Sequence, residues 1–186
     1  MHRRAVLLLL IVGCSPIPKD TEPPCPALPD PLPGLQEGPA PWQPAHATLE
    51  TRLTAIGAPI LTQEGSLVDR HFQVTIEIDG RAVTVPALIG INGTEVAGGK
   101  METGFVTEMH THDDSGIVHV HANSDRLFLL GEFFDVWGVA LGEKRIGGYC
   151  DGVDRVMTVT VNGTVAEGDP RLIEIEDQAT IEIATG

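Results

Sequence analysis

Positive charge is scarce in this chain. Lys and Arg together number 12 against 26 Asp and Glu, so the formal net charge is −14 over 186 residues. Such an acidic surface repels the phosphates of nucleic acids and of anionic lipids. The composition therefore argues against nucleic acid as a partner, and it suits a soluble domain that attracts cations weakly.

Long apolar runs are also missing. The run from Ala5 to Val12 follows the basic pair Arg3-Arg4 and is too short to span a bilayer. This pattern predicts a signal peptide over residues 1–13. Its end, Ile11-Val12-Gly13-Cys14, resembles the lipobox of bacterial lipoproteins. The resemblance implies cleavage before Cys14, acyl chains on that cysteine, and anchoring to a cell-envelope membrane, either the outer membrane or the periplasmic face of a membrane.

Cysteine is rare, with three residues in the whole chain. The lipobox accounts for Cys14, which leaves Cys25 and Cys150 in an oxidising compartment. These two could form a disulfide, or Cys150 could act as a soft metal ligand or as a nucleophile beside a histidine. The sequence leaves these alternatives open.

Proline content divides the chain into a tether and a domain. Eleven of the 14 prolines lie between Ser15 and His46, and proline favours an extended, semi-rigid chain. We therefore expect residues 14–46 to form a lipidated, disordered tether, in which Trp42 is a candidate for docking on the domain. Residues 47–186 have the length of a single globular domain.

Short apolar patterns predict the fold of this domain. Asp79-Gly80 and Asn162-Gly163 are turn signals between alternating apolar segments, and Gly138 ends a helical pattern. The fold class expected is mainly β (α+β), a small antiparallel sheet of hairpins with one or two short helices. The expected elements are helices over 48–56 and 130–137, strands over 72–78, 156–161, 172–175 and 179–183, and an irregular loop over 90–104 that could hide a short strand.

Histidine is concentrated in one short segment. Four of the seven histidines are His110, His112, His119 and His121, on the expected strands 105–109 and 117–120 and their ends. If 113–116 is an even-numbered loop, facing residues have numbers that sum to 229. His110 then faces His119, and Glu108 faces His121. All four imidazoles and Glu108 would share one face of the hairpin, because alternate residues of a strand do so.

Imidazoles gathered on one face point to a metal site. Neutral imidazole binds zinc and copper, and ligands on adjacent strands can converge on one ion. We expect copper or zinc to bind through His110, His112, His119 and His121, with His71 as a ligand from the neighbouring hairpin. Asp113, Asp114 or Glu108 would complete the ligand set or orient an imidazole.

Three functions remain open at this point. The first is an envelope lipoprotein that captures, buffers or delivers a divalent transition metal. The second is a docking module for another envelope protein, which needs no metal. The third is a metal-dependent hydrolase or oxidase. Binding is favoured over catalysis, because the chain shows neither a phosphate-binding glycine loop nor a serine in a nucleophile elbow.

Two further motifs resemble a known group of proteins. The His110–His119 segment, followed by Leu130-Gly131, Phe133-Phe134-Asp135 and Trp137-Gly138, is similar to a family of uncharacterised secreted or membrane-anchored bacterial and archaeal proteins. The resemblance runs from about His71 to the C-terminus and implies a shared fold and His-rich centre, but no reaction. Relatives often carry His-x-His where this chain has His71-Phe72-Gln73, and Glu where it has His121.

Overall fold

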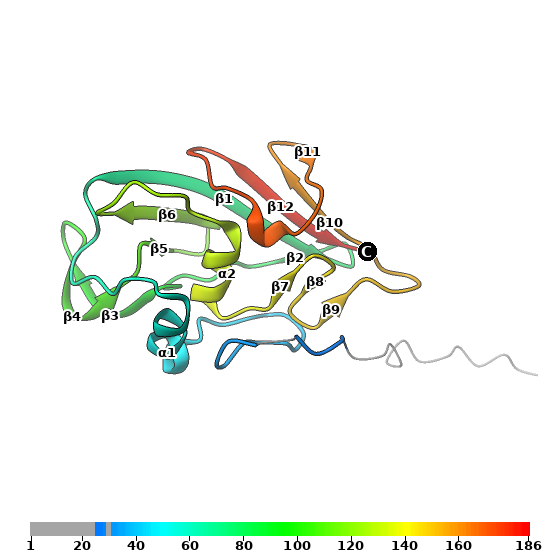
Figure 1. The fold of residues 1–186 in the computed structure, drawn as a ribbon, viewed down its shortest axis with the longest axis horizontal. Coiled ribbons are helices and arrows are strands. Elements are labelled where there is room, and N and C mark those ends of the chain that lie inside the picture. The colour runs from blue at the N-terminus through cyan, green and yellow to red at the C-terminus, as the bar shows by residue number, and fades with distance from the viewer. Residues whose placement is uncertain (1–24, 29–30) are drawn as a thin grey trace, which may run out of the picture.

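Seven strands form the principal sheet of the computed structural model, which describes residues 25–28 and 31–186. The order along the sheet is β11-β10-β12-β1-β6-β5, with β2 paired to β1 (Figure 1). Neighbours are antiparallel, except that β1 and β12 run parallel. The strands are β1 (Val68–Ile78), β2 (Arg81–Val83), β5 (Met109–His110), β6 (Ile117–Ala122), β10 (Met157–Val161), β11 (Thr164–Val165) and β12 (Thr180–Thr185). The predicted mainly-β class is confirmed.

The remaining elements lie around this sheet. They are the hairpin β3 (Ile91–Val96) and β4 (Lys100–Val106), the small sheet β7 (Leu141–Gly142), β8 (Arg145–Ile146) and β9 (Tyr149–Cys150), the helices α1 (His46–Ile56) and α2 (Leu130–Trp137), and a 3₁₀ helix at Pro170–Leu172. No helix among the described residues is both long enough and apolar enough to cross a membrane.

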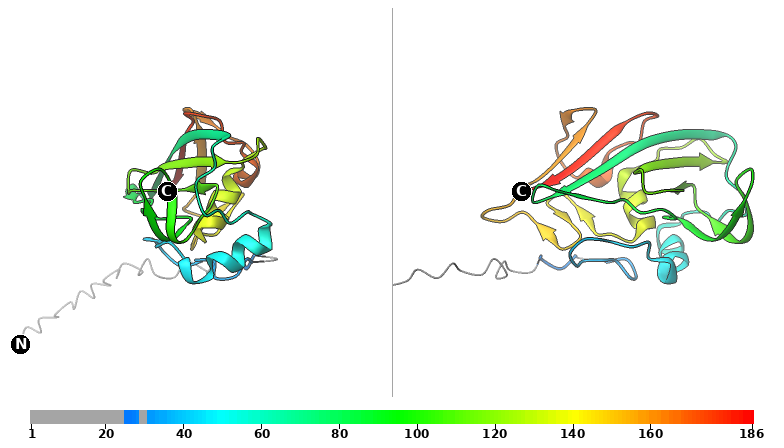
Figure 2. Two further views of the ribbon diagram at one scale, coloured as in Figure 1. Left: turned by 90° about the vertical axis from the view of Figure 1, so that its left-hand side faces the viewer. Right: turned by 180° about the vertical axis from the view of Figure 1, so that it is seen from behind.

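Helix α2 fills the centre of the domain. It lies between the principal sheet and a layer made of α1 and residues 31–45, which precede α1 (Figures 1 and 2). Phe133, Phe134 and Trp137 are fully buried, and the ring of Phe133 meets Phe72 of β1 edge-on at 5.9 Å. Gly138 ends the helix with a φ of 82°, as predicted. The helix thus covers the apolar face of the sheet, so the functional side chains lie on the other face.

The two predicted Asx-Gly turns are confirmed. Asp79 and Gly80 have φ values of 49° and 73°, and Asn162 and Gly163 have 51° and 77°. Each pair joins two antiparallel strands, β1 to β2 and β10 to β11. Two consecutive positive φ values match the twist of a two-residue hairpin, and Asx-Gly pairs adopt them at low cost.

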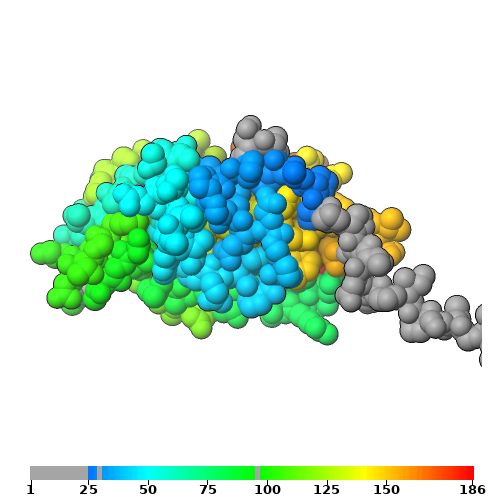
Figure 3. All heavy atoms as spheres, turned by 90° about the horizontal axis from the view of Figure 1, so that it is seen from below, coloured from blue at the N-terminus to red at the C-terminus, as the bar shows by residue number. Residues whose placement is uncertain are grey.

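Part of the proline-rich segment packs on the domain. Trp42 is 2% exposed and makes edge contacts at 6.1 Å with both Trp137 and Tyr149. Cys25 and Cys150 form a disulfide, so Cys150 is neither a free thiol nor a metal ligand in this structure. Figure 3 shows this segment spread over the face next to α1. A disordered tether extending to His46 is therefore wrong for residues 31–46. The expected signal peptide, Cys14 and the start of the tether lie outside the described residues.

Two local expectations are also wrong. Residues 90–104 are the hairpin β3–β4 instead of an irregular loop. Its glycines allow close contact between strands, because a Cβ on Gly104 would lie 1.8 Å from the carbonyl oxygen of Asn92. Residues 172–175 form only an isolated antiparallel bridge, Glu174 with Leu129, instead of a strand. Leu172 belongs to a 3₁₀ turn that begins at Pro170 and that the Asp169 side chain caps by accepting the Arg171 N–H at 3.0 Å.

Candidate metal centre

Three neighbouring strands carry the histidines in one row. His110 of β5 pairs with His119 of β6, and His119 pairs on its other side with His71 of β1. Met109 pairs with Val120, so the predicted register, in which facing numbers sum to 229, is confirmed. The ring centroids lie 4.5 Å apart for His71 and His119 and 5.7 Å apart for His119 and His110.

The second residue of each His-x-His pair extends this row. The ring of His112 lies 4.9 Å from His110 and 4.6 Å from His119, and the ring of His121 lies 5.3 Å from His119. The alternate residues Met109, Val118 and Val120 are buried in the core. All five predicted ligands therefore gather on the face away from α2, which we call the histidine cluster: His71, His110, His112, His119 and His121.

A carboxylate outside the predicted set lies inside this cluster. Oε1 of Glu64 is 2.8 Å from Nε2 of His110 and 3.2 Å from Nε2 of His112. Oε2 of the same residue is 3.2 Å from Nδ1 of His121. One carboxylate thus contacts three of the five imidazoles.

Close backbone packing holds Glu64 in this position. Its N–H donates to the carbonyl of Gly99 at 2.8 Å. The next residue, Gly65, lies against β6, where a Cβ would be 2.2 Å from the carbonyl carbon of Ala122. Glu64 precedes β1 and is 46 residues away from His110, so no local motif marked it. In the sequence, Glu64 is marked by the glycine that follows it, and an acid before a glycine is too common to identify a metal ligand.

A second acid, Asp69, lies at the other end of the cluster. Its Oδ1 is 3.3 Å from Nε2 of His121 and 3.6 Å from Nδ1 of His71. The carboxylate is 72% exposed, whereas that of Glu64 is 17% exposed. The cluster therefore has an acid on its buried side and another on its solvent side.

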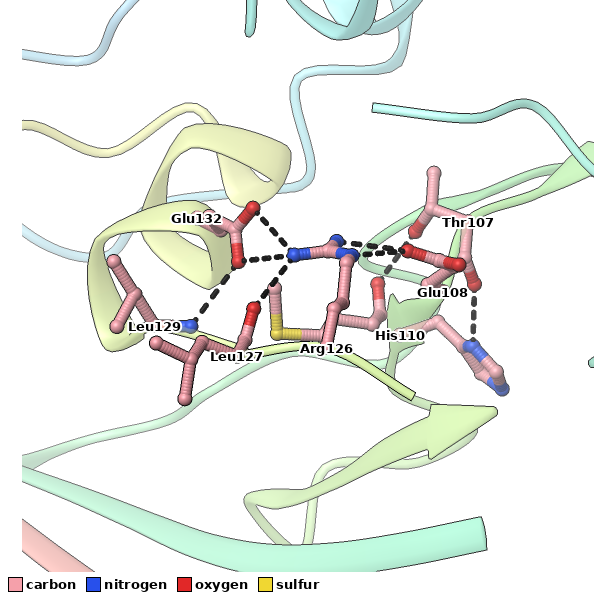
Figure 4. A network of polar contacts seen from close by, with 8 residues as sticks. Thr107, Glu108, His110, Arg126, Leu127, Leu129 and Glu132 are labelled. Carbon is pink, nitrogen blue, oxygen red and sulfur yellow. Dashed lines mark hydrogen bonds and ion pairs between the residues drawn. The ribbon is translucent and has the colours of Figure 1, made fainter. Parts of the chain in front are cut away.

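Glu108 was expected to share the histidine face, and this expectation is wrong. Its carboxylate turns away and accepts hydrogen bonds from Arg126 at 2.8 and 3.2 Å (Figure 4). Arg126 also donates to Glu132, whose side chain accepts the N–H of Leu129 at the start of α2. β4 ends at Val106 and β5 begins only at Met109. The strict alternation of side chains that the prediction assumed is therefore broken before Glu108.

The loop acids Asp113 and Asp114 were expected to complete the ligand set or to orient an imidazole, and they lie in the turn between β5 and β6. Oδ1 of Asp113 accepts the N–H of Ser115 at 2.9 Å, which closes the turn between β5 and β6. Hydrogen bonds from the side chain and the backbone of Ser115 lower the pKa of the Asp113 carboxyl. Both residues are exposed at the turn. Asp113 therefore shapes the hairpin that carries the histidines.

His110 is oriented like a metal ligand. Its Nδ1 donates to the carbonyl of Thr107 at 2.9 Å, because a carbonyl oxygen can only accept. Nε2 is directed at Glu64 and lies 2.8 Å from its Oε1. Ligating histidines commonly fix their second nitrogen in this way. The side chain of His110 is fully buried, which leaves it little freedom to turn.

The electrostatics of the cluster favour a neutral His119 and an ionised Glu64. Burial lowers the pKa of His119 to about 4, and repulsion from neighbouring imidazoles adds to the shift. The hydrogen bond from His110 lowers the pKa of Glu64 to about 2. Nδ1 of both His119 and His121 is buried without a hydrogen-bond partner among the described residues. A neutral imidazole with an unsatisfied nitrogen, as in His119, and a carboxylate are donors that a metal cation requires.

Among the described residues, two sets of side chains have ligand atoms close enough to hold a metal ion. One is His71, His119 and His121, and the other is Glu64, His110 and His121. Within each set the ligand atoms lie within 4.8 Å of one another. His112 joins the second set through Glu64. His46 lies outside the cluster, where its Nε2 contacts the carbonyl of Leu88.

Comparisons with protein-family models, with curated proteins and with solved structures found no match for this chain.

Proposed function

We propose that this protein binds a divalent transition metal, copper or zinc, at the histidine cluster and Glu64. The observation that carries the proposal is the convergence of two preformed ligand sets, each within 4.8 Å, on one small region of the sheet. The oriented ring of His110 and the unsatisfied Nδ1 of His119 support it further.

The separations between ligand atoms fit a small tetrahedral ion. Zinc binds nitrogen and oxygen ligands at about 2.0–2.1 Å, so two ligands of a regular tetrahedron lie about 3.3–3.4 Å apart. Glu64 lies 3.2 Å from both His112 and His121, and Asp69 lies 3.3 Å from His121. Other ligand atoms of each set lie up to 4.8 Å apart, so binding an ion requires the side chains to close around it.

The chemistry of the donors selects the kind of metal. Five imidazoles with two carboxylates suit zinc and copper, whereas calcium and magnesium prefer sites built of oxygen ligands. We further propose that the protein works in the bacterial cell envelope, held there by lipid on Cys14. Its task would be capture, buffering or delivery of the metal.

Calorimetric titration of the full chain, after removal of metals with a chelator, tests the binding. We expect Zn²⁺ or Cu²⁺ to bind more tightly than about 10 µM. His110→Ala should weaken binding at least tenfold, because it removes a buried, oriented ligand. His46→Ala is the matched control, since it removes a histidine outside the cluster and should leave the affinity unchanged.

Two results would overturn the proposal. One is the failure of both metals to bind more tightly than about 10 µM. The other is equal binding by wild type and by a His110→Ala variant that keeps its fold by circular dichroism. The envelope assignment has its own test. Mass spectrometry of the protein from bacterial membranes should find an acylated Cys14 as the first residue, and an uncleaved N-terminus would refute it.

A further inference from the structure

We propose that the cluster holds two metal ions, joined by the imidazole ring of His121. This inference rests on the proposed metal-binding function and specifies the number of ions and the group between them. It starts from the position of His121 between the two acids. Its Nδ1 lies 3.2 Å from Glu64, and its Nε2 lies 3.3 Å from Asp69.

The two nitrogens of an imidazole ring point in different directions, so they serve two different ions. Nδ1 of His121 faces the buried set, which contains Glu64 and His110. Nε2 faces the outer set through Asp69, which also contacts His71. Nδ1 is buried and lies against the Glu64 carboxylate, so it is directed into the buried set.

Each set has enough donors for four-coordination. The buried set comprises Glu64, His110 and His121, with His112 beside Glu64 as the fourth donor. The outer set comprises His71, His119 and His121, with Asp69 beside His71 as the fourth donor. A single tetrahedral ion would use four of these seven side chains and leave three unused.

The charges of the cluster offset most of the charge of two ions. Two divalent cations bring four positive charges, and Glu64 and Asp69 bring two negative charges. A ring that binds through both nitrogens must lose its N–H proton to solvent, so His121 becomes an imidazolate and adds a third negative charge. One positive charge then remains, to be neutralised by a solvent-derived or external anion at the exposed end near Asp69.

Metal stoichiometry measured on the full chain distinguishes this inference from the broader proposal. After saturation with Zn²⁺ or Cu²⁺ and gel filtration, elemental analysis should find two ions per chain. One ion per chain would overturn the two-ion inference and leave metal binding standing. No bound ion would overturn both.

Single variants should remove one ion at a time. His71→Ala should lose the outer ion and Glu64→Gln the buried ion, each leaving one per chain, while His46→Ala keeps two. If either variant lost both ions, the two sets would not be separate sites. Circular dichroism of each metal-free variant shows whether its fold is retained. Glu64→Gln keeps the shape of the side chain, so its result is informative even where an alanine would disturb packing.

Electron paramagnetic resonance with Cu²⁺ tests the bridge itself. Two Cu²⁺ ions that share an imidazolate couple magnetically, so the spin signal should fall when the second equivalent is added. His71→Ala with one Cu²⁺ should give the full signal of one isolated ion. Two ions whose signals simply add would contradict a bridging role for His121.

Discussion

Arg126→Met should destabilise the domain far more than the loss of an ordinary surface charge. Arg126 lies between Glu108 and Glu132, with nitrogen–oxygen distances of 2.8 and 2.9 Å (Figure 4). The side chain of Glu108 is only 6% exposed. Removing its partner leaves a buried carboxylate without a counter-charge, which costs about 3–5 kcal/mol. At about 2–4 °C per kcal/mol for a domain of this size, Tm should fall by about 6–20 °C.

Arg70→Met is the matched control. Arg70 pairs with Asp125 at 3.1 Å, but the Asp125 side chain is 72% exposed, so this pair should contribute about 0–1 kcal/mol. Urea and thermal unfolding of both metal-free variants measure the difference. Equal losses in the two variants would refute the claim that Glu108 depends on Arg126.

A double variant separates charge from packing. Arg126→Met combined with Glu108→Leu should recover most of the lost stability, because replacing both members of a buried pair by apolar groups is often neutral. The single variant should also weaken metal binding, since the carbonyl of Glu108 accepts the N–H of His121 at 2.9 Å. A double variant as unstable as the single one would mean that lost packing, and not the unpaired carboxylate, causes the destabilisation.

Three further perturbations have defined outcomes. Gly65→Ala should weaken metal binding about tenfold or more, because the added Cβ would clash with the backbone of β6 and shift Glu64. Gly142→Ala is the control, since a Cβ there meets open space and should not change the affinity. Equal affinities of the two variants would show that Gly65 does not position Glu64. Replacing Cys25 and Cys150 by alanine should lower the free energy of unfolding, measured in urea, by about 2–5 kcal/mol, because the disulfide closes a loop with a sequence separation of 125. A decrease below about 1 kcal/mol would contradict this account. NMR titration of the metal-free protein should show His119 neutral down to about pH 5, with its pKa near 4. The unfolded chain takes up this proton near pH 6.5, so the contribution of His119 to the free energy of unfolding is complete above pH 6.5 and declines as the pH falls toward 4. A midpoint near pH 6.5 in the NMR titration of His119 would refute the shift.

Local chemistry explains which parts of the fold the sequence could predict. The register of the His-rich hairpin followed from a turn and a period of two, both of which depend on neighbouring residues. The helix ending at Gly138 followed from apolar spacing and one glycine. Five metal-ligand candidates were found in this way, and all five lie in one cluster.

Contacts between distant segments explain what could not be predicted. Glu64 reaches the cluster through a backbone contact of Gly65 with β6, and Glu108 leaves it because Arg126 attracts its carboxylate. The parallel pairing of β1 with β12 joins strands about 100 residues apart. Trp42 docks on the domain as expected, but proline content alone indicated a disordered tether for the segment that carries it. Each of these outcomes depends on tertiary packing, which short sequence patterns do not encode.

The energetic cost of the cluster is itself an argument for a ligand. Burial among neighbouring imidazoles lowers the pKa of His119 and leaves its Nδ1 without a hydrogen-bond partner among the described residues. Local conflicts of this kind are typical of functional sites. A bound cation would use the unsatisfied nitrogen and oppose the charge of Glu64. It would also link the segment before β1 to the β5–β6 hairpin. Binding would therefore stabilise the folded state, by about 2.7 kcal/mol at a metal concentration of 100 Kd.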